Sequence, residues 1–233
     1  MSSEIRIALI AEGLTDTIIL EASLKAILHP NHPFVLTQLQ PEATRPELGT
    51  GWGGVLKWCY EQSSRGLEAD PTLSQFDLII IHLDADVLGN SYADYGPDFV
   101  NLAADNNFHP LPCQVSCPPP SSAIDQLKIV LSSWLDPVQP ATKTVVCIPS
   151  KSSDAWLVAG AFTSPHKILS NIQCNLNLET QLLQLPKKER FKKTGKDYRI
   201  RSEQIEKNWS VVKSICPQAQ DFETEVKHKL SLP

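Results

Sequence analysis

Short apolar runs alternate with segments of helical periodicity over the first two-thirds of the chain. Four runs bounded by turn residues predict buried strands: Glu4–Ala11, Phe34–Leu39, Asp77–Asp84 and Thr144–Ile148. The run at Asp77–Asp84 (DLIIIHLD) is nearly continuous, which is typical of a strand that a parallel sheet buries on both faces. We therefore expect a mainly parallel sheet.

Residues with helical spacing occupy the intervals between these strands. After Gly13, Thr15 or Asp16 is placed to begin a helix whose apolar positions recur three and four residues apart. Helices are also expected over Val55–Ser64 and Ala123–Leu135. Strands that alternate with helices in this way predict an α/β fold in which helices flank the sheet.

The chain changes character after the fourth strand. Only helices are expected there, over Asp154–Phe162, Leu178–Leu185 and Glu203–Cys216. The last one has an apolar stripe that indicates core packing, or a partner surface if exposed: Ile205, Trp209, Val212 and Cys216. We expect a domain over residues 1–165, and a basic segment with C-terminal helices over residues 166–233.

The interval 87–122 is aperiodic and rich in proline, so we expect a long insertion that is either functional or disordered. Within it, His109, Cys113 and Cys117 have the spacing of three zinc ligands, although structural zinc normally takes four. The glycine-rich stretch 49–54 is open to two interpretations. It could approach a phosphate, but it lacks the P-loop pattern, so a flexible turn before a helix is favoured.

Composition places the protein among ordered globular chains. Of its 233 residues, 42% are hydrophobic and 20% charged, which suffices for a core and differs from disordered or fibrous sequences. No apolar run approaches the roughly 20 residues of a membrane span, and the N-terminus lacks a secretory signal pattern. The six cysteines are scattered, so we expect free thiols and a cytoplasmic protein without membrane contact.

Charge is distributed unevenly. The segment Lys187–Arg201 carries a net charge of +6. Since the whole chain has a net charge of −5, the rest of the chain carries −11. Phe191 and Tyr198 are interleaved with the charges, as in a stripe that binds a nucleic-acid backbone. Two other interpretations of this segment stay open: it is a solvated linker, or its basic side chains pair with the protein's own acids. The basic residues are Lys187, Lys188, Arg190, Lys192, Lys193, Lys196, Arg199 and Arg201.

Acids follow three of the four predicted strands. Asp84 and Asp86 end the third strand, where residues i and i+2 point the same way. Glu12 and Asp16 follow the first strand. Since the carboxyl ends of parallel strands share one edge of a sheet, these four carboxylates are expected to form one site, suited to Mg²⁺ or Mn²⁺.

The fourth strand adds two candidates. Lys151 lies in the loop after it, and Asp154 lies at the start of the next helix. Asp154 could join the metal site. Aspartates at such positions also serve as simple helix caps, so capping is an alternative for Asp154 and for Asp16.

The stretch Ile7–Asp16 (IALIAEGLTD), followed by Leu78–Asp86 with its DAD, resembles the Toprim domain, and more narrowly the Toprim of OLD-family nucleases and small stand-alone Toprim proteins. The passage Pro149–Leu157 is similar to a downstream helix of those proteins. The resemblance covers roughly residues 4–160, with gaps.

This resemblance implies a Toprim-like (Rossmann-like) fold and a Mg²⁺-dependent phosphoryl-transfer site. Glu12 would bind metal and assist proton transfer, while Asp16, Asp84 and Asp86 would complete the core ligands. Lys151 matches a lysine used by some nucleases of the group. The late acid is often glutamate, whereas Asp154 is shorter.

We therefore expect a metal-dependent nuclease that cuts or nicks DNA or RNA. OLD-type nucleases work with an ABC-type ATPase, and this chain has no ATPase motif, so a separate ATPase subunit or a homodimer is implied. Two alternatives stay open: a non-catalytic interaction subunit, and a DxD-dependent nucleotidyl or glycosyl transferase.

Overall fold

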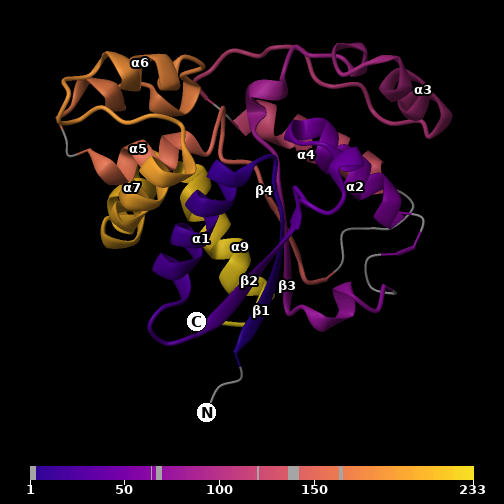
Figure 1. Cartoon of the computed structure of the whole chain (residues 1–233), viewed down its shortest axis with the longest axis horizontal. Coiled ribbons are helices and arrows are strands. Elements are labelled where there is room, and N and C mark those ends of the chain that lie inside the picture. The colour runs from indigo at the N-terminus through magenta and orange to yellow at the C-terminus, as the bar shows by residue number, and fades with distance from the viewer. Residues whose placement is uncertain (1–3, 64, 67–69, 120, 136–141, 163–164) are drawn as a thin grey trace.

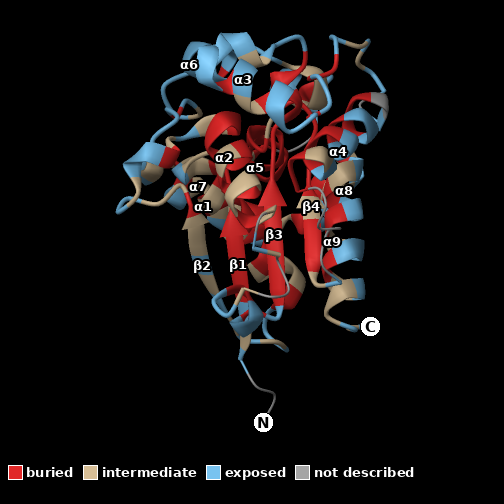
Figure 2. Ribbon diagram, turned by 90° about the vertical axis from the view of Figure 1, so that its right-hand side faces the viewer, coloured by how far each residue is buried: buried red, intermediate tan, exposed pale blue. Residues whose placement is uncertain are grey.

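Four parallel strands form one sheet in the order β2-β1-β3-β4, which Figure 2 shows from left to right. The computed structural model describes residues 4–63, 65–66, 70–119, 121–135, 142–162 and 165–233. The strands are β1 (Ile5–Ile10), β2 (Phe34–Gln40), β3 (Leu78–His82) and β4 (Thr144–Cys147). Every residue of β3 is buried. The predicted parallel α/β arrangement is therefore confirmed.

Helices cover both faces of the sheet (Figure 1), and each face has its own buried apolar cluster. One face packs against α1 (Leu14–Leu28), α5 (Asp154–Ala161), α7 (Gly195–Lys207), α8 (Trp209–Ile215) and α9 (Pro217–Lys229), and α6 (Leu178–Gln184) extends this layer. The other face packs against α2 (Gly51–Ser63), α3 (Pro97–Asp105) and α4 (Ser121–Leu135). Ser64, the predicted end of the second helix, lies outside the described residues.

The C-terminal helices share one core with the sheet. The predicted stripe Ile205, Trp209, Val212 and Cys216 is buried in it, which confirms core packing. The helix expected over Glu203–Cys216 is two helices, because the chain breaks at Asn208, whose Nδ2 donates to the Gly160 carbonyl at 2.9 Å. A Cβ on Gly160 would lie 3.0 Å from the Ile205 backbone, so glycine permits this close contact between α5 and α7.

The predicted boundary at residue 165 directly follows residues 163–164, which lie outside the described residues. On its C-terminal side, α9 is a helix that the sequence pattern did not predict. Its buried residues are only Ala219, Phe222 and Val226, which is a sparse apolar signal.

The interval 87–122 is more ordered than its sequence suggests. It contains α3, and Tyr95 and Phe99 pack against Trp52, with ring centroids 4.9 and 6.1 Å away. A Cβ on Gly53 would lie 2.3 Å from the Tyr95 ring. The glycine-rich stretch thus leads into α2, which begins at Gly51, and Gly53 allows close aromatic packing. Pro120 lies outside the described residues.

A disulfide joins Cys117, within this interval, to Cys174. It corrects the expectation of free thiols throughout and removes one member of the expected zinc trio, since Cys117 is bonded to sulfur. Cys113 is free and exposed. Among the described helices, none combines the length and apolar composition that a bilayer crossing demands. The cytoplasmic location remains a prediction.

Candidate functional site

The carboxyl ends of the two central strands are joined by a glutamate. Glu12 follows β1, and its Oε1 accepts a hydrogen bond of 2.7 Å from the backbone N–H of Asp84, which follows β3. Since β1 and β3 are neighbours in the sheet, two acids predicted from separate strand ends lie side by side.

Ser153 connects this pair to the first turn of α1. Its backbone N–H donates to Asp84 Oδ1 at 3.0 Å, and its hydroxyl donates to Asp16 Oδ1 at 2.7 Å. All three residues are buried. Asp16 does not cap α1, whose N-cap residue Gly13 makes no side-chain cap bond. Asp16 therefore belongs to the acidic site, and the capping alternative is wrong for it.

The expected strand geometry of Asp84 and Asp86 is wrong. β3 ends at His82, and Asp86 lies in the 3₁₀ turn Ala85–Val87 that follows Asp84. The chain turns there because the Ala85 N–H donates to the carbonyl of Ser150 at 2.8 Å, next to β4. Asp84 is consequently buried, whereas Asp86 is exposed at the rim of the site.

His82, the last residue of β3, is a fully buried member of the site. Its Nε2 lies 3.0 Å from Asp84 Oδ1. Burial alone would lower the pKa of His82, but the charges of Asp84, Asp16 and Glu12 raise it to about 9. The surrounding carboxylates therefore favour protonated His82, which would pair with Asp84 Oδ1, whereas neutral His82 would offer a nitrogen to a metal. The available signal was the position of His82, two residues before the first aspartate of the DAD.

Asp154 carries an ion pair from the basic segment. Lys193 Nζ lies 3.0 Å from Asp154 Oδ2, and the hydroxyl of Tyr198 donates to Asp154 Oδ1 at 2.9 Å. Asp154 is buried and in the first turn of α5, but both its oxygens face α7 and the loop before it, so it is not a helix cap. Burial disfavours the charge of Lys193, yet Asp154 raises the pKa of the lysine above its ordinary value.

The structure places two lysines near the acids in different ways. Lys151 is buried, and its Nζ makes a long hydrogen bond of 3.4 Å to the carbonyl of Ala85. Lys193 keeps 34% of its side chain exposed and faces a carboxylate. Nothing in the sequence distinguishes Lys193 from the other seven basic residues of its segment, because its proximity to Asp154 depends on how the segment folds back over α5.

The basic segment differs from the stripe expected of it. Phe191 and Tyr198 are buried, so neither ring is available for base stacking. Arg201 lies over the Phe191 ring, 5.4 Å from its centroid. Besides Lys193, six basic residues of the segment are exposed: Lys187, Lys188, Arg190, Lys192, Lys196 and Arg199.

The crowded acids hold protons more tightly than ordinary carboxyls. Burial, and then the charge of Asp84, raise the pKa of Glu12 well above its usual value. Burial raises the pKa of Asp84 to about 7, even though His82 opposes the shift. Burial and the charge of Asp16 raise the pKa of Asp86, against the opposing charge of Lys193. Burial is the largest cause of all three shifts, so the low-polarity surroundings of the site disfavour bare carboxylate charge.

A divalent cation fits this site. One ligand atom each of Asp16, His82 and Asp84 lies within 4.8 Å of the others. Glu12 is not in this group, but its Oε1 accepts from the amide of Asp84 beside it. Hard oxygen donors suit Mg²⁺ or Mn²⁺, and His82 supports Asp84 from behind, as the outer partners of metal ligands do.

The raised pKa values predict how the stability of the metal-free protein depends on pH. Glu12, Asp84 and Asp86 bind protons more tightly when folded than when unfolded, and so does His82. The contribution of these four groups to stability is therefore greatest at low pH and falls as pH rises through about 7 for Asp84 and about 9 for His82, while Glu223, whose pKa is lowered, contributes with the opposite sign.

In EDTA, we expect Tm to fall by several degrees between pH 5 and pH 8, since 1 kcal/mol shifts Tm by roughly 2–4 °C at this size. Saturating Mg²⁺ should raise Tm more at pH 8 than at pH 5, and D84N should flatten the slope. Differential scanning fluorimetry measures all three. A Tm that rises toward pH 8, or an unchanged slope in D84N, would contradict the assignment.

Comparison with protein-family models, with curated proteins and with solved structures finds no match. The fold and the site thus define the class directly: a parallel α/β protein with an acidic, cation-fitting cluster at the carboxyl edge of its sheet.

Proposed function

We propose that this protein is a divalent-metal-dependent nuclease that hydrolyses phosphodiesters of DNA or RNA. The observation that carries the proposal is the convergence of Glu12, Asp16 and Asp84 at one sheet edge, with Lys193 beside Asp154. The Toprim resemblance of the sequence around Glu12 and Asp84 supports the same conclusion.

Each residue has a role that follows from its position. Glu12, Asp16 and Asp84 would hold Mg²⁺ or Mn²⁺, with Asp86 and Asp154 at the rim. The metal would lower the pKa of an attacking water and offset charge on the phosphate oxygens. Glu12 is the best-placed proton acceptor, because its pKa is raised toward the working range of a general base. Lys193 would meet the phosphate.

The exposed basic residues explain how a polyanion could approach an acidic protein. Lys193 belongs to the same segment as Lys192 and Lys196, so the exposed cations lead directly to the acidic cluster. A phosphate backbone bound along this segment would deliver one phosphodiester to the site.

Incubation of the purified protein with supercoiled plasmid and Mg²⁺ or Mn²⁺ tests the proposal. We expect nicked or linear product that EDTA suppresses. An ATPase partner or a second copy, implied by the resemblance, is part of the proposal, so the assay is repeated over a range of protein concentrations and with a candidate ATPase. Absence of cleavage of DNA and RNA in every arm would overturn it.

Salt dependence separates backbone contacts from incidental charge. The triple variant K187A/K188A/R190A should weaken DNA affinity and reduce the slope of log K against log[salt] by up to about 3, roughly one for each lost phosphate contact. Fluorescence anisotropy with a labelled duplex measures the slope. The control is K227A, in α9, which should leave the slope unchanged. An equal slope in the triple variant would remove these residues from the interface.

A further inference from the structure

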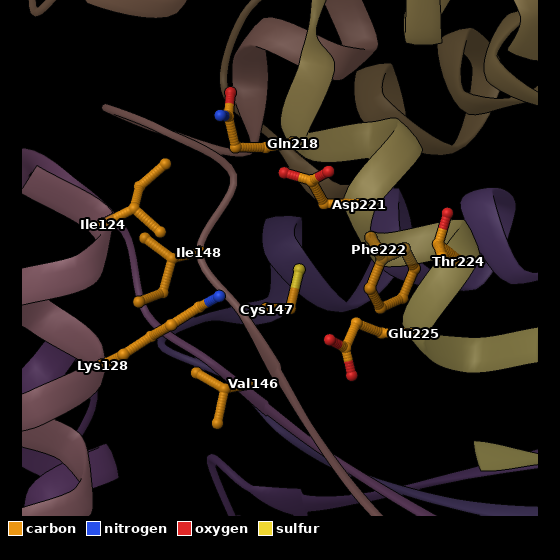
Figure 3. Close-up of a pocket in the computed structure, with 10 residues that line it drawn as sticks. All are labelled: Ile124, Lys128, Val146, Cys147, Ile148, Gln218, Asp221, Phe222, Thr224 and Glu225. Atoms are coloured by element: carbon orange, nitrogen blue, oxygen red, sulfur yellow. The ribbon is translucent and has the colours of Figure 1, made fainter. Parts of the chain in front are cut away.

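The outer edge of β4 forms the floor of a groove between α4 and α9 (Figure 3). Its cavity measures about 170 Å³ and is lined by residues of all three elements. β4 is the last strand of the sheet and pairs only with β3 among the described residues. The groove reaches Cys147, which pairs with His82 of the acidic site across the sheet, but it belongs to no function proposed so far.

The backbone of β4 offers hydrogen-bonding groups to this groove. The carbonyls of Lys143 and Cys147 accept from Ile79 and Leu83 of the β3 side, at 2.9 and 3.1 Å. Since successive residues of a strand face opposite edges, the backbone groups of Thr144 and Val146 face outward. Neither makes a backbone hydrogen bond to another described residue at that edge, but Thr144 is buried, and of the two only Val146 lines the groove.

The two walls of the groove differ in chemistry. On the α4 side, Ile124 of the helix is apolar and Lys128 is basic, and the apolar Val146 and Ile148 lie next to them on the strand side. On the α9 side, Asp221 and Glu225 lie one helical turn apart, and neither is in an ion pair with another described residue. Figure 3 shows both carboxylates around the groove, with the Lys128 side chain extending toward Cys147 from the opposite wall.

We propose that this groove binds an extended peptide segment of a partner protein, which adds a fifth strand beside β4 and alternates apolar with basic side chains. Strand addition at a sheet edge gains affinity from backbone hydrogen bonds and specificity from alternate side chains. The apolar side chains would contact the α4 wall, and the basic ones would face Asp221 and Glu225. The alternation follows from the period of two in a strand.

The probe for this proposal is a fluorescein-labelled peptide, KVKVKVK, titrated with the full chain by fluorescence polarisation. Its matched control has the same sequence with N-methyl groups on alternate residues, which keeps the charge but removes the strand donors. A second control peptide is EVEVEVE. We expect KVKVKVK to bind at least about tenfold more tightly than either control, and the Val146 amide to become protected from hydrogen exchange.

Two charge-reversed proteins distinguish the groove from the general acidity of the molecule. D221K/E225K should weaken peptide binding at least about tenfold. D98K/D105K makes the same change in net charge on two exposed positions of α3, so it should stay within about twofold of the parent. Circular dichroism establishes that both variants are folded.

Three results would overturn the proposal: equal affinity for the N-methylated peptide, equal weakening by D98K/D105K, or no saturable binding at millimolar peptide. Analytical sedimentation of the free protein tests whether a second copy of this chain occupies the groove. A dimer that D221K/E225K dissociates and KVKVKVK does not displace would assign the groove to a second copy of this chain, against a peptide partner.

Discussion

Replacing Asp84 by asparagine is expected to abolish metal-dependent cleavage, with kcat/KM reduced by at least about 10³-fold. Asp84 is the centre of the site, since it contacts Glu12 through its amide, and Ser153 and His82 through Oδ1. The amide of asparagine keeps the shape but loses the charge that a dication requires. Loss of several kcal/mol of metal-based stabilisation corresponds to this factor, at tenfold per 1.36 kcal/mol.

The measurement is a time course of plasmid nicking with Mn²⁺, together with Mn²⁺ affinity by isothermal titration. E12Q should behave like D84N. The control is E206Q, an exposed carboxylate on α7 outside the acidic site, which should retain parental activity. Circular dichroism and Tm show whether D84N is folded. Parental cleavage by a folded D84N would exclude this cluster as the catalytic centre.

Removing Lys193 is expected to separate cleavage from metal binding. In K193A, cleavage should fall by about 10²-fold, because a cation that would stabilise charge on the phosphate is lost. Mn²⁺ affinity should be unchanged or increased, because Lys193 no longer offsets the charge of Asp154. This pattern is the reverse of D84N, which should lose metal affinity as well as activity.

The matched comparison is K151A. The resemblance assigns the catalytic lysine to Lys151, but in the structure Lys151 is buried against the carbonyl of Ala85, while Lys193 faces a carboxylate and solvent. We expect K193R to recover part of the activity and K151A to lower Tm more than K193A does. If K151A abolishes cleavage at unchanged Tm and K193A does not, the sequence-based assignment is correct and the role given to Lys193 is wrong.

The strands were predictable because a strand that is buried on both faces requires a nearly continuous run of apolar residues. Leu78–His82 is apolar except for its last residue, and the structure buries all of it. The acids at strand ends were equally visible, because parallel strands must share one carboxyl edge. Glu12 and Asp84 therefore lie together as expected.

Other parts of the molecule have a weaker sequence pattern and were not predicted. α3 buries only Phe99 and Ala103, and α9 buries only Ala219, Phe222 and Val226, so their helical spacing rests on very few apolar residues. The bend that turns Asp86 out of the strand depends on a hydrogen bond from Ala85 to Ser150, far along the chain. Alternation within one strand cannot report such a contact.

The sequence by itself determined the parallel α/β architecture and the acidic edge of the sheet, since both follow from local patterns of apolar and charged residues. Only the tertiary structure decided which groups complete the site. Ser153 joins Asp16 to Asp84, and Lys193 reaches Asp154 because its segment folds back over α5. Such contacts join residues that are distant in the chain. They depend on how the whole molecule packs, which a local sequence pattern does not determine.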